Sequence, residues 1–133
     1  MAGSEFENLV TVSAGFPSPA NDYLEPDLDY NSFLKRNPSS TFSMRVDGES
    51  MVDSCIPHNS IIVVDRSIKP VNNSVVVVTL NGERIIKHLV RTRDGIFLLP
   101  ANKKYKAIKV EEGMDFTVWG TVTHAIIEVF KKK

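Results

Sequence analysis

The sequence contains a single cysteine, Cys55, among its 133 residues. One cysteine excludes an internal disulfide framework and any zinc site built from several cysteines, and it is typical of a protein from a reducing compartment. The chain also lacks an apolar run long enough to span a bilayer, and no apolar signal segment opens it. We therefore expect a cytoplasmic protein that makes no use of a membrane.

An excess of one charge is also missing, because 16 Lys and Arg residues balance 16 Asp and Glu residues. This balance argues against non-specific electrostatic binding to DNA. The charges are nevertheless unevenly distributed: residues 1–60 hold three basic and nine acidic residues, and residues 61–133 hold thirteen and seven. The acidic half could lie on the basic half, both could face other partners, or both could be solvated surfaces.

The chain divides into three parts by composition. Residues 1–6 read as a cloning scar, since Gly-Ser and Glu-Phe are encoded by common restriction sites. Residues 7–40 hold four of the seven prolines and are expected to form a flexible N-terminal arm. Only 29–36 has a helical pattern there, with Asp29 as a suitable N-cap. Residues 41–133 are predicted to form one β-rich domain.

Period-2 alternation and β-branched residues dominate the chain after residue 40. They predict strands at 41–46, 61–65, 74–80, 83–90, 96–99 and 116–130. Gly120 lies inside the last of these and indicates a bend or bulge. The predicted fold is therefore mostly β, a single β-domain with one short helix in its arm.

A lysine occupies an unexpected position in the predicted hairpin. Asn81-Gly82 is a strong signal for a two-residue turn, and this turn places Val76 opposite Lys87. Lys87 then lies among apolar side chains on one face of the hairpin. Its pKa must fall from near 10.4 to below about 7 for the amine to be neutral at pH 7, and a neutral amine is a general base. Alternatively, Lys87 extends its ammonium group to the sheet edge.

The segment Gly48-Glu49-Ser50-Met51 follows the first predicted strand through a turn. If a helical turn begins at Met51, the Ser50 hydroxyl lies beside free backbone N–H groups that can hold an oxyanion. Ser50 would then be a nucleophile for which Lys87 is the base. The alternative is an ordinary serine N-cap.

These residues resemble a known family. Ser50 within GESM, and Lys87 37 positions later at the end of RIIK, resemble the Ser–Lys self-cleaving proteins of the LexA/UmuD type. Residues 14–20 (AGFPSPA) are similar to the cleavage segment of the UmuD type, and residues 119–124 (WGTVTH) to the closing strand of the family. The resemblance covers roughly residues 13–128. The UmuD type fits better than the repressors, because nothing before residue 14 is suited to a helix-turn-helix.

The resemblance implies a fold, an activity and a set of partners. The fold is the LexA/UmuD-like β-domain, and the activity is that of a serine peptidase that acts on itself. Ser50 is the nucleophile, Lys87 the general base, Ala14–Gly15 the scissile bond, and the N–H groups of Glu49 and Ser50 the oxyanion hole. The protein would be a homodimer whose cleavage a RecA–single-stranded-DNA filament stimulates. Its shortened form would serve a UmuC-like Y-family polymerase in error-prone translesion synthesis during the SOS response, with no metal, cofactor or sequence-specific DNA binding.

Two other functional classes remain open. The chain could be the autoproteolytic and dimerisation domain of a LexA-like or phage-type repressor, or a β-rich binding module that never cleaves. A Ser50–His88–Asp53 triad would need another hairpin register, since alternation places His88 and Lys87 on opposite faces. The histidines and Cys55 have no metal-ligand spacing, and we expect Cys55 to be a small apolar filler.

Overall fold

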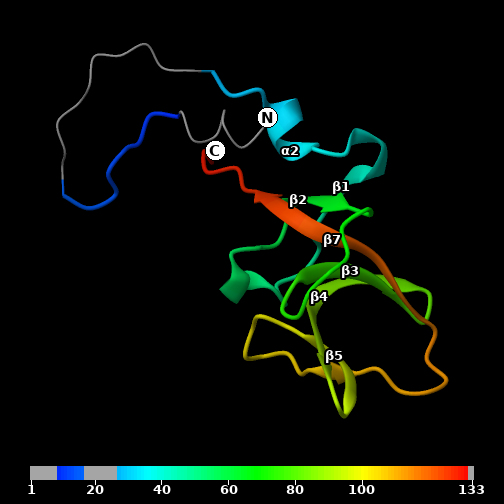
Figure 1. The fold of residues 1–133 in the computed structure, drawn as a ribbon. Coiled ribbons are helices and arrows are strands. Elements are labelled where there is room, and N and C mark those ends of the chain that lie inside the picture. The colour runs from blue at the N-terminus through cyan, green and yellow to red at the C-terminus, as the bar shows by residue number, and fades with distance from the viewer. Residues whose placement is uncertain (1–8, 17–26, 132–133) are drawn as a thin grey trace. The chain divides into compact units, whose positions relative to one another are not determined.

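The computed structural model describes residues 9–16 and 27–131 (Figure 1). The chain divides into two compact units, Met1–Arg36 and Asn37–Lys133. The predicted cloning scar at residues 1–6 lies outside the described residues, as do residues 17–26 of the predicted arm. Within the described residues, no helix is both long and apolar enough to cross a membrane.

The first unit contains the short helix α2 (Tyr30–Leu34). Asp29 is its N-cap, as predicted, and the carboxylate accepts hydrogen bonds from the backbone N–H groups of Asn31 and Ser32. These bonds satisfy two of the amide groups that a helix start leaves without partners. The helix stops two residues short of the predicted end at Arg36.

The second unit is built on one antiparallel sheet, which has seven strands in the described part of the chain. The spatial order is β1-β2-β7-β3-β4-β5-β6 (Figure 1). The described part of the chain also has two 3-10 turns, η1 (Pro38–Ser40) just before β1 and η2 (Val52–Ser54) between β1 and β2. The strands are β1 (Thr41–Arg45), β2 (Ile61–Asp65), β3 (Val75–Leu80), β4 (Glu83–Thr92), β5 (Gly95–Leu99), β6 (Ile108–Lys109) and β7 (Phe116–Ile126). The predicted mostly β fold is confirmed.

Strand β7 lies between β2 and β3 and holds the two halves of the sheet together. Its register shifts once against β3, beside Gly120, and once against β2. The bulge predicted at Gly120 is therefore present. The strand ends at Ile126, four residues before the predicted end, where its partner β2 begins at Ile61. The backbone groups of the preceding residue, Ser60, bond to Pro57 and Val46 instead.

The β3–β4 hairpin has the predicted register. Asn81 and Gly82 both have positive φ, 50° and 84°, as a two-residue hairpin turn requires. Leu80 pairs with Glu83, and Val76 pairs with Lys87. The turn chemistry therefore fixes which residue of β4 faces which residue of β3.

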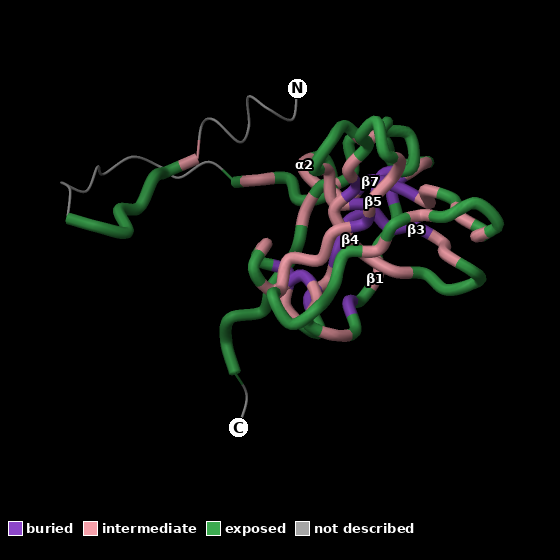
Figure 2. Tube along the Cα trace, turned by 90° about the horizontal axis from the view of Figure 1, so that it is seen from below, coloured by how far each residue is buried: buried purple, intermediate pink, exposed green. Residues whose placement is uncertain are grey.

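Among the described residues, the core consists of two apolar clusters, one on each face of the hairpin. One cluster is centred on Met51, Val64 and Val77, and the other on Val76 and Leu98. Figure 2 shows the buried segments gathered in the middle of the sheet. The turn that carries Ser50 is anchored in the first cluster through Met51, which is fully buried.

A buried carboxylate fixes the start of the second unit. Asp65, at the end of β2, accepts hydrogen bonds from the side chains of Asn37, Ser40 and Ser67. Burial alone would raise the pKa of Asp65, but these hydrogen bonds outweigh it and lower the pKa to about 2. The charged carboxylate thus ties residues 37–40 to the sheet.

Candidate active site

Ser50 lies on the turn between β1 and η2. The turn passes through Gly48 at a φ of +106°, a backbone conformation that favours glycine. The Ser50 carbonyl accepts a hydrogen bond of 2.7 Å from the backbone N–H of Ala101. Since η2 begins at Val52 and has no side-chain cap bond, the Ser50 hydroxyl does not serve as an N-cap.

Lys87 reaches the same point from the middle of β4. Its Nζ atom lies 2.8 Å from Ser50 Oγ, within hydrogen-bonding distance. Among the described residues, no carboxylate forms an ion pair with the amine. Burial lowers the pKa of the Lys87 amine, because the charged form loses water on folding. Both features favour the neutral amine that a general base requires.

A cleft of about 360 Å³ opens at the two side chains. Ser50 and Lys87 both line it. Its other lining residues are Met44, Arg45, Val46, Asp47, Ile62, Val77, Arg84, Ile85 and Ile86. The wall thus combines apolar side chains with the charged side chains of Arg45, Asp47 and Arg84, beside a hydroxyl and an amine.

One side of the cleft is an open strand edge, with which no described strand pairs. Residues 84–87 of β4 pair with β3, but pairing with β5 begins only at His88. The backbone groups of Leu89 face β3, since its N–H donates to Ser74 and its carbonyl accepts from Asn73. By alternation, the backbone groups of Arg84 and Ile86 face the open edge. An extended peptide could add to the sheet there, beside the Lys87 amine.

The predicted oxyanion hole is formed by the N–H groups of Glu49 and Ser50. Neither N–H donates a hydrogen bond to another described residue. Their carbonyls, by contrast, are held, because the Asn102 side-chain amide donates to Glu49 at 2.7 Å and the backbone N–H of Ala101 donates to Ser50. Asn102 carried no signal in the sequence, since it lies more than 50 residues from the turn that it holds.

The predicted cleavage site belongs to the first unit. Ala14 and Gly15 are both exposed. The backbone N–H of Gly15 donates to the Ser13 hydroxyl at 3.2 Å, and that hydroxyl donates to the carbonyl of Phe16. The bond between Ala14 and Gly15 therefore lies in a local bend in which both residues are exposed.

The contacts of His88 do not build a serine–histidine triad. His88 Nε2 lies 2.7 Å from Ser54 Oγ, and His88 Nδ1 lies 2.8 Å from the Asn73 carbonyl oxygen. Neither Ser50 nor Asp53 is its partner. The contact between Ser54 and His88 joins η2 to β4 one residue from Lys87. It therefore supports the same two segments that the Ser50–Lys87 contact connects.

Cys55 does not fill the core, and that prediction was wrong. The side chain is exposed and the residue has a left-handed φ of 62° at the end of η2. Among the described residues, no group of three His, Cys, Asp or Glu side chains is arranged to hold a metal ion.

The comparisons with known proteins agree on one family. Residues 8–123 match the Peptidase S24-like family. Protein MucA of Salmonella typhimurium is 37% identical over 121 residues, which cover 90% of this chain and 82% of MucA. Protein SamA of Salmonella typhimurium strain LT2 is 38% identical over 110 residues, 83% of this chain and 76% of SamA.

A repressor is also similar, over a smaller share of its own length. LexA repressor 1 of Xanthomonas campestris pv. campestris is 35% identical over 114 residues, 84% of this chain and 55% of the repressor. The family match extends across the turn of Ser50 and the strand of Lys87. The chain belongs to the Peptidase S24-like family, in which its relatives are those of the UmuD type.

Proposed function

We propose that this protein is a self-cleaving accessory subunit of an error-prone translesion DNA polymerase in the SOS response. Ser50 and Lys87 form its catalytic dyad and cut the chain between Ala14 and Gly15. The observation that carries the proposal is the 2.8 Å contact between a serine hydroxyl and a partly buried lysine without an acidic partner among the described residues. The relatives MucA and SamA favour this function over that of a repressor.

The reaction is an acyl transfer in two stages. The neutral amine of Lys87 takes the hydroxyl proton of Ser50, and Oγ attacks the carbonyl carbon of Ala14. The N–H groups of Glu49 and Ser50 stabilise the resulting oxyanion. The Lys87 ammonium then gives its proton to the departing amine of Gly15, and the C–N bond breaks. Water, deprotonated by Lys87, hydrolyses the ester to Ser50 and restores the dyad.

The open edge of β4 supplies a docking site for the segment that is cut. A strand added there pairs with the outward-facing backbone groups of Arg84 and Ile86 and brings its carbonyls past Ser50. The small methyl group of Ala14 and the absence of a side chain at Gly15 allow the backbone to approach the nucleophile closely. In the sequence, Pro17 and Pro19 disfavour a helix just after the bond and so support an extended segment.

The partners follow from the proposed function. A RecA–single-stranded-DNA filament stimulates cleavage, and the shortened chain, residues 15–133, acts with a UmuC-like Y-family polymerase in the cytoplasm. The protein works as a homodimer, so the segment that is cut comes either from the same subunit or from its neighbour. No metal or cofactor takes part in the chemistry.

Intact-mass measurement tests the proposal. The purified chain is incubated at about pH 9, because alkali deprotonates lysine. The incubation is done with and without a RecA filament. We expect loss of residues 1–14 from the wild type and no loss from Ser50→Ala or Lys87→Ala. Ser43→Ala is the matched control, since this serine is exposed on β1 and does not line the cleft. Cleavage by Ser50→Ala, or an unchanged mass of the wild type under all conditions, would overturn the proposal.

A further inference from the structure

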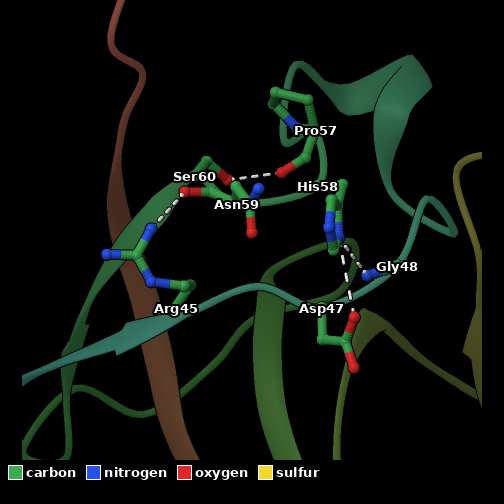
Figure 3. Close-up of polar contacts among 7 residues, drawn as sticks. All are labelled: Arg45, Asp47, Gly48, Pro57, His58, Asn59 and Ser60. Carbon is green, nitrogen blue, oxygen red and sulfur yellow. Dashed lines mark hydrogen bonds and ion pairs between the residues drawn. The ribbon is translucent and has the colours of Figure 1, made fainter.

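The imidazole of His58 holds the backbone at the entrance to the Ser50 turn. The N–H of Gly48 donates a hydrogen bond of 2.9 Å to His58 Nδ1. Figure 3 shows the dashed lines to the Gly48 amide and to the Asp47 carboxylate leaving from the same end of the ring. Gly48 is two residues before the proposed nucleophile, so this bond acts on the segment that carries it.

The turn that carries His58 is itself firmly attached to β1. The backbone of Val46 bonds both Ser60 and Asn59, at 2.9 and 2.8 Å. Arg45 Nη1 donates to the Asn59 carbonyl at 3.0 Å, and the Ser60 hydroxyl closes the turn on Pro57 at 2.7 Å (Figure 3). The backbone of the turn that carries His58 is therefore held in place, and the side chain can in turn hold the Gly48 amide.

The bond requires a particular form of the ring. An N–H group can donate only to a nitrogen that has a free lone pair, so the contact from Gly48 needs the His58 tautomer that has its hydrogen on Nε2. Asp47 Oδ1 lies 3.6 Å from the same nitrogen. A proton on Nδ1 would replace the bond from Gly48 with an ion pair to that exposed carboxylate.

Hydrogen bonds fix the Ser50 turn from two sides. On its far side, Asn102 and Ala101 hold the carbonyls of Glu49 and Ser50. On its near side, the bond from Gly48 to His58 is the only hydrogen bond to a side chain that fixes the backbone of residues 46–48 among the described residues. The N–H of Gly48 belongs to the Asp47–Gly48 peptide, so loss of this bond would leave that peptide free to rotate. Because glycine has a wide range of backbone conformations, Gly48 would pass this rotation on to the next peptide and turn the Glu49 N–H away from the oxyanion position.

We propose that His58 is a positioning residue for self-cleavage. Its neutral imidazole fixes the Gly48 amide, and through it the two N–H groups and the hydroxyl that the reaction uses. The inference rests on the proposed function, since it assigns His58 a part in that reaction. It makes His58 a residue that touches neither the scissile bond nor the dyad and still controls the rate.

Two amide substitutions separate the role of Nδ1 from that of Nε2. The Oδ1 atom of asparagine can occupy the position of Nδ1, whereas the Oε1 atom of glutamine lies near the position of Nε2. We expect His58→Asn to cleave within about twofold of wild type, and His58→Gln and His58→Ala to cleave about tenfold more slowly or worse, as misplaced reacting groups do. The assay is the rate of intact-mass change at about pH 9, the pH of the test of the proposed function.

Amide hydrogen exchange at Gly48 tests the contact itself. It is measured in the uncleaved Ser50→Ala protein, alone and combined with each substitution of His58. We expect Gly48 to be protected in Ser50→Ala alone and in its combination with His58→Asn, and to exchange faster when His58→Gln or His58→Ala is added. Equal denaturation midpoints for all variants would exclude general unfolding as the cause.

The outcomes separate this inference from the proposed function. A wild type that never cleaves itself overturns the proposed function, whatever the exchange data show. A wild type that cleaves, with His58→Ala cleaving equally fast, overturns only the role of His58. Slow cleavage by His58→Asn together with full protection of Gly48 would also overturn it, because the contact would then be present without its effect.

Discussion

The rate of self-cleavage should rise with pH, because Lys87 must lose its proton before it can accept one from Ser50. Well below the pKa of the amine, the neutral fraction increases tenfold for each pH unit. A plot of the logarithm of the rate against pH should therefore have a slope of about one, and the rate should grow about 100-fold over two pH units in that range.

The position of the plateau follows from the surroundings of the amine. The ordinary pKa of a lysine is 10.5, and burial of Lys87 lowers it. No ion pair with a described carboxylate opposes this shift. The rate should therefore level off below pH 10.5, since the amine is already neutral there.

The assay is the initial rate of formation of the 15–133 product, followed by intact mass in a series of buffers at constant ionic strength. Lys87→Arg is the matched variant, because it keeps the positive charge but stays protonated throughout this range. Ser50→Ala at each pH corrects for hydrolysis by hydroxide alone. A wild-type rate that is flat or falling between about pH 7 and 10 would refute the role of Lys87 as a base.

Two further predictions concern the sheet that holds the site. A Cβ atom at Gly120 would lie 2.6 Å from Val64 Cγ1, so Gly120→Ala should lower the free energy of unfolding by about 1–3 kcal/mol in urea titrations. Adding Val64→Ala to this variant should recover part of the loss. An unchanged unfolding midpoint of Gly120→Ala would contradict this crowding. Asp65→Ala should cost about 2 kcal/mol at pH 7 through its lost hydrogen bonds. Because the folded pKa of Asp65 is about 2 and its ordinary value is 3.8, this difference between wild type and variant should shrink as the pH falls from about 4 towards 2; a constant difference would show that the charge of Asp65 contributes nothing.

The hairpin was predictable from sequence because its geometry is local. Asn81 and Gly82 specify a two-residue turn, and such a turn leaves only one register for the strands on either side. That register places Lys87 opposite Val76, which is fully buried. The unusual surroundings of Lys87 could thus be inferred without any knowledge of the rest of the fold.

The supports of the Ser50 turn could not be found in this way. Asn102 reaches Glu49 across 53 positions of the sequence, and no periodicity connects them. His58 is only ten positions from Gly48, but their contact depends on the left-handed turn at Asn59 and its attachment to β1. Such contacts depend on tertiary packing, which a pattern within one segment does not contain.

The exposure of Cys55 at the end of η2 could not be predicted from the sequence pattern either. Cysteine is usually buried, which favoured an interior position for Cys55. The turn instead requires a left-handed residue at this point, with its N–H bonded to Val52, and the side chain then points to solvent. A local backbone requirement here outweighs the general tendency of the residue type.

The edge beside Lys87 is open because the backbone groups of Ala101 bond to the Ser50 turn and η2 rather than to β4. Strand β5 pairs Leu99 with His88, and continuation of this register would set Ala101 opposite Ile86. The N–H of Ala101 instead donates to Ser50 and its carbonyl accepts from Asp53, both at 2.7 Å. The bonds that would have closed the sheet over Ile86 are therefore used to hold the Ser50 turn. A single departure of the chain after Leu99 both fixes the proposed nucleophile and leaves an edge at which a peptide can dock.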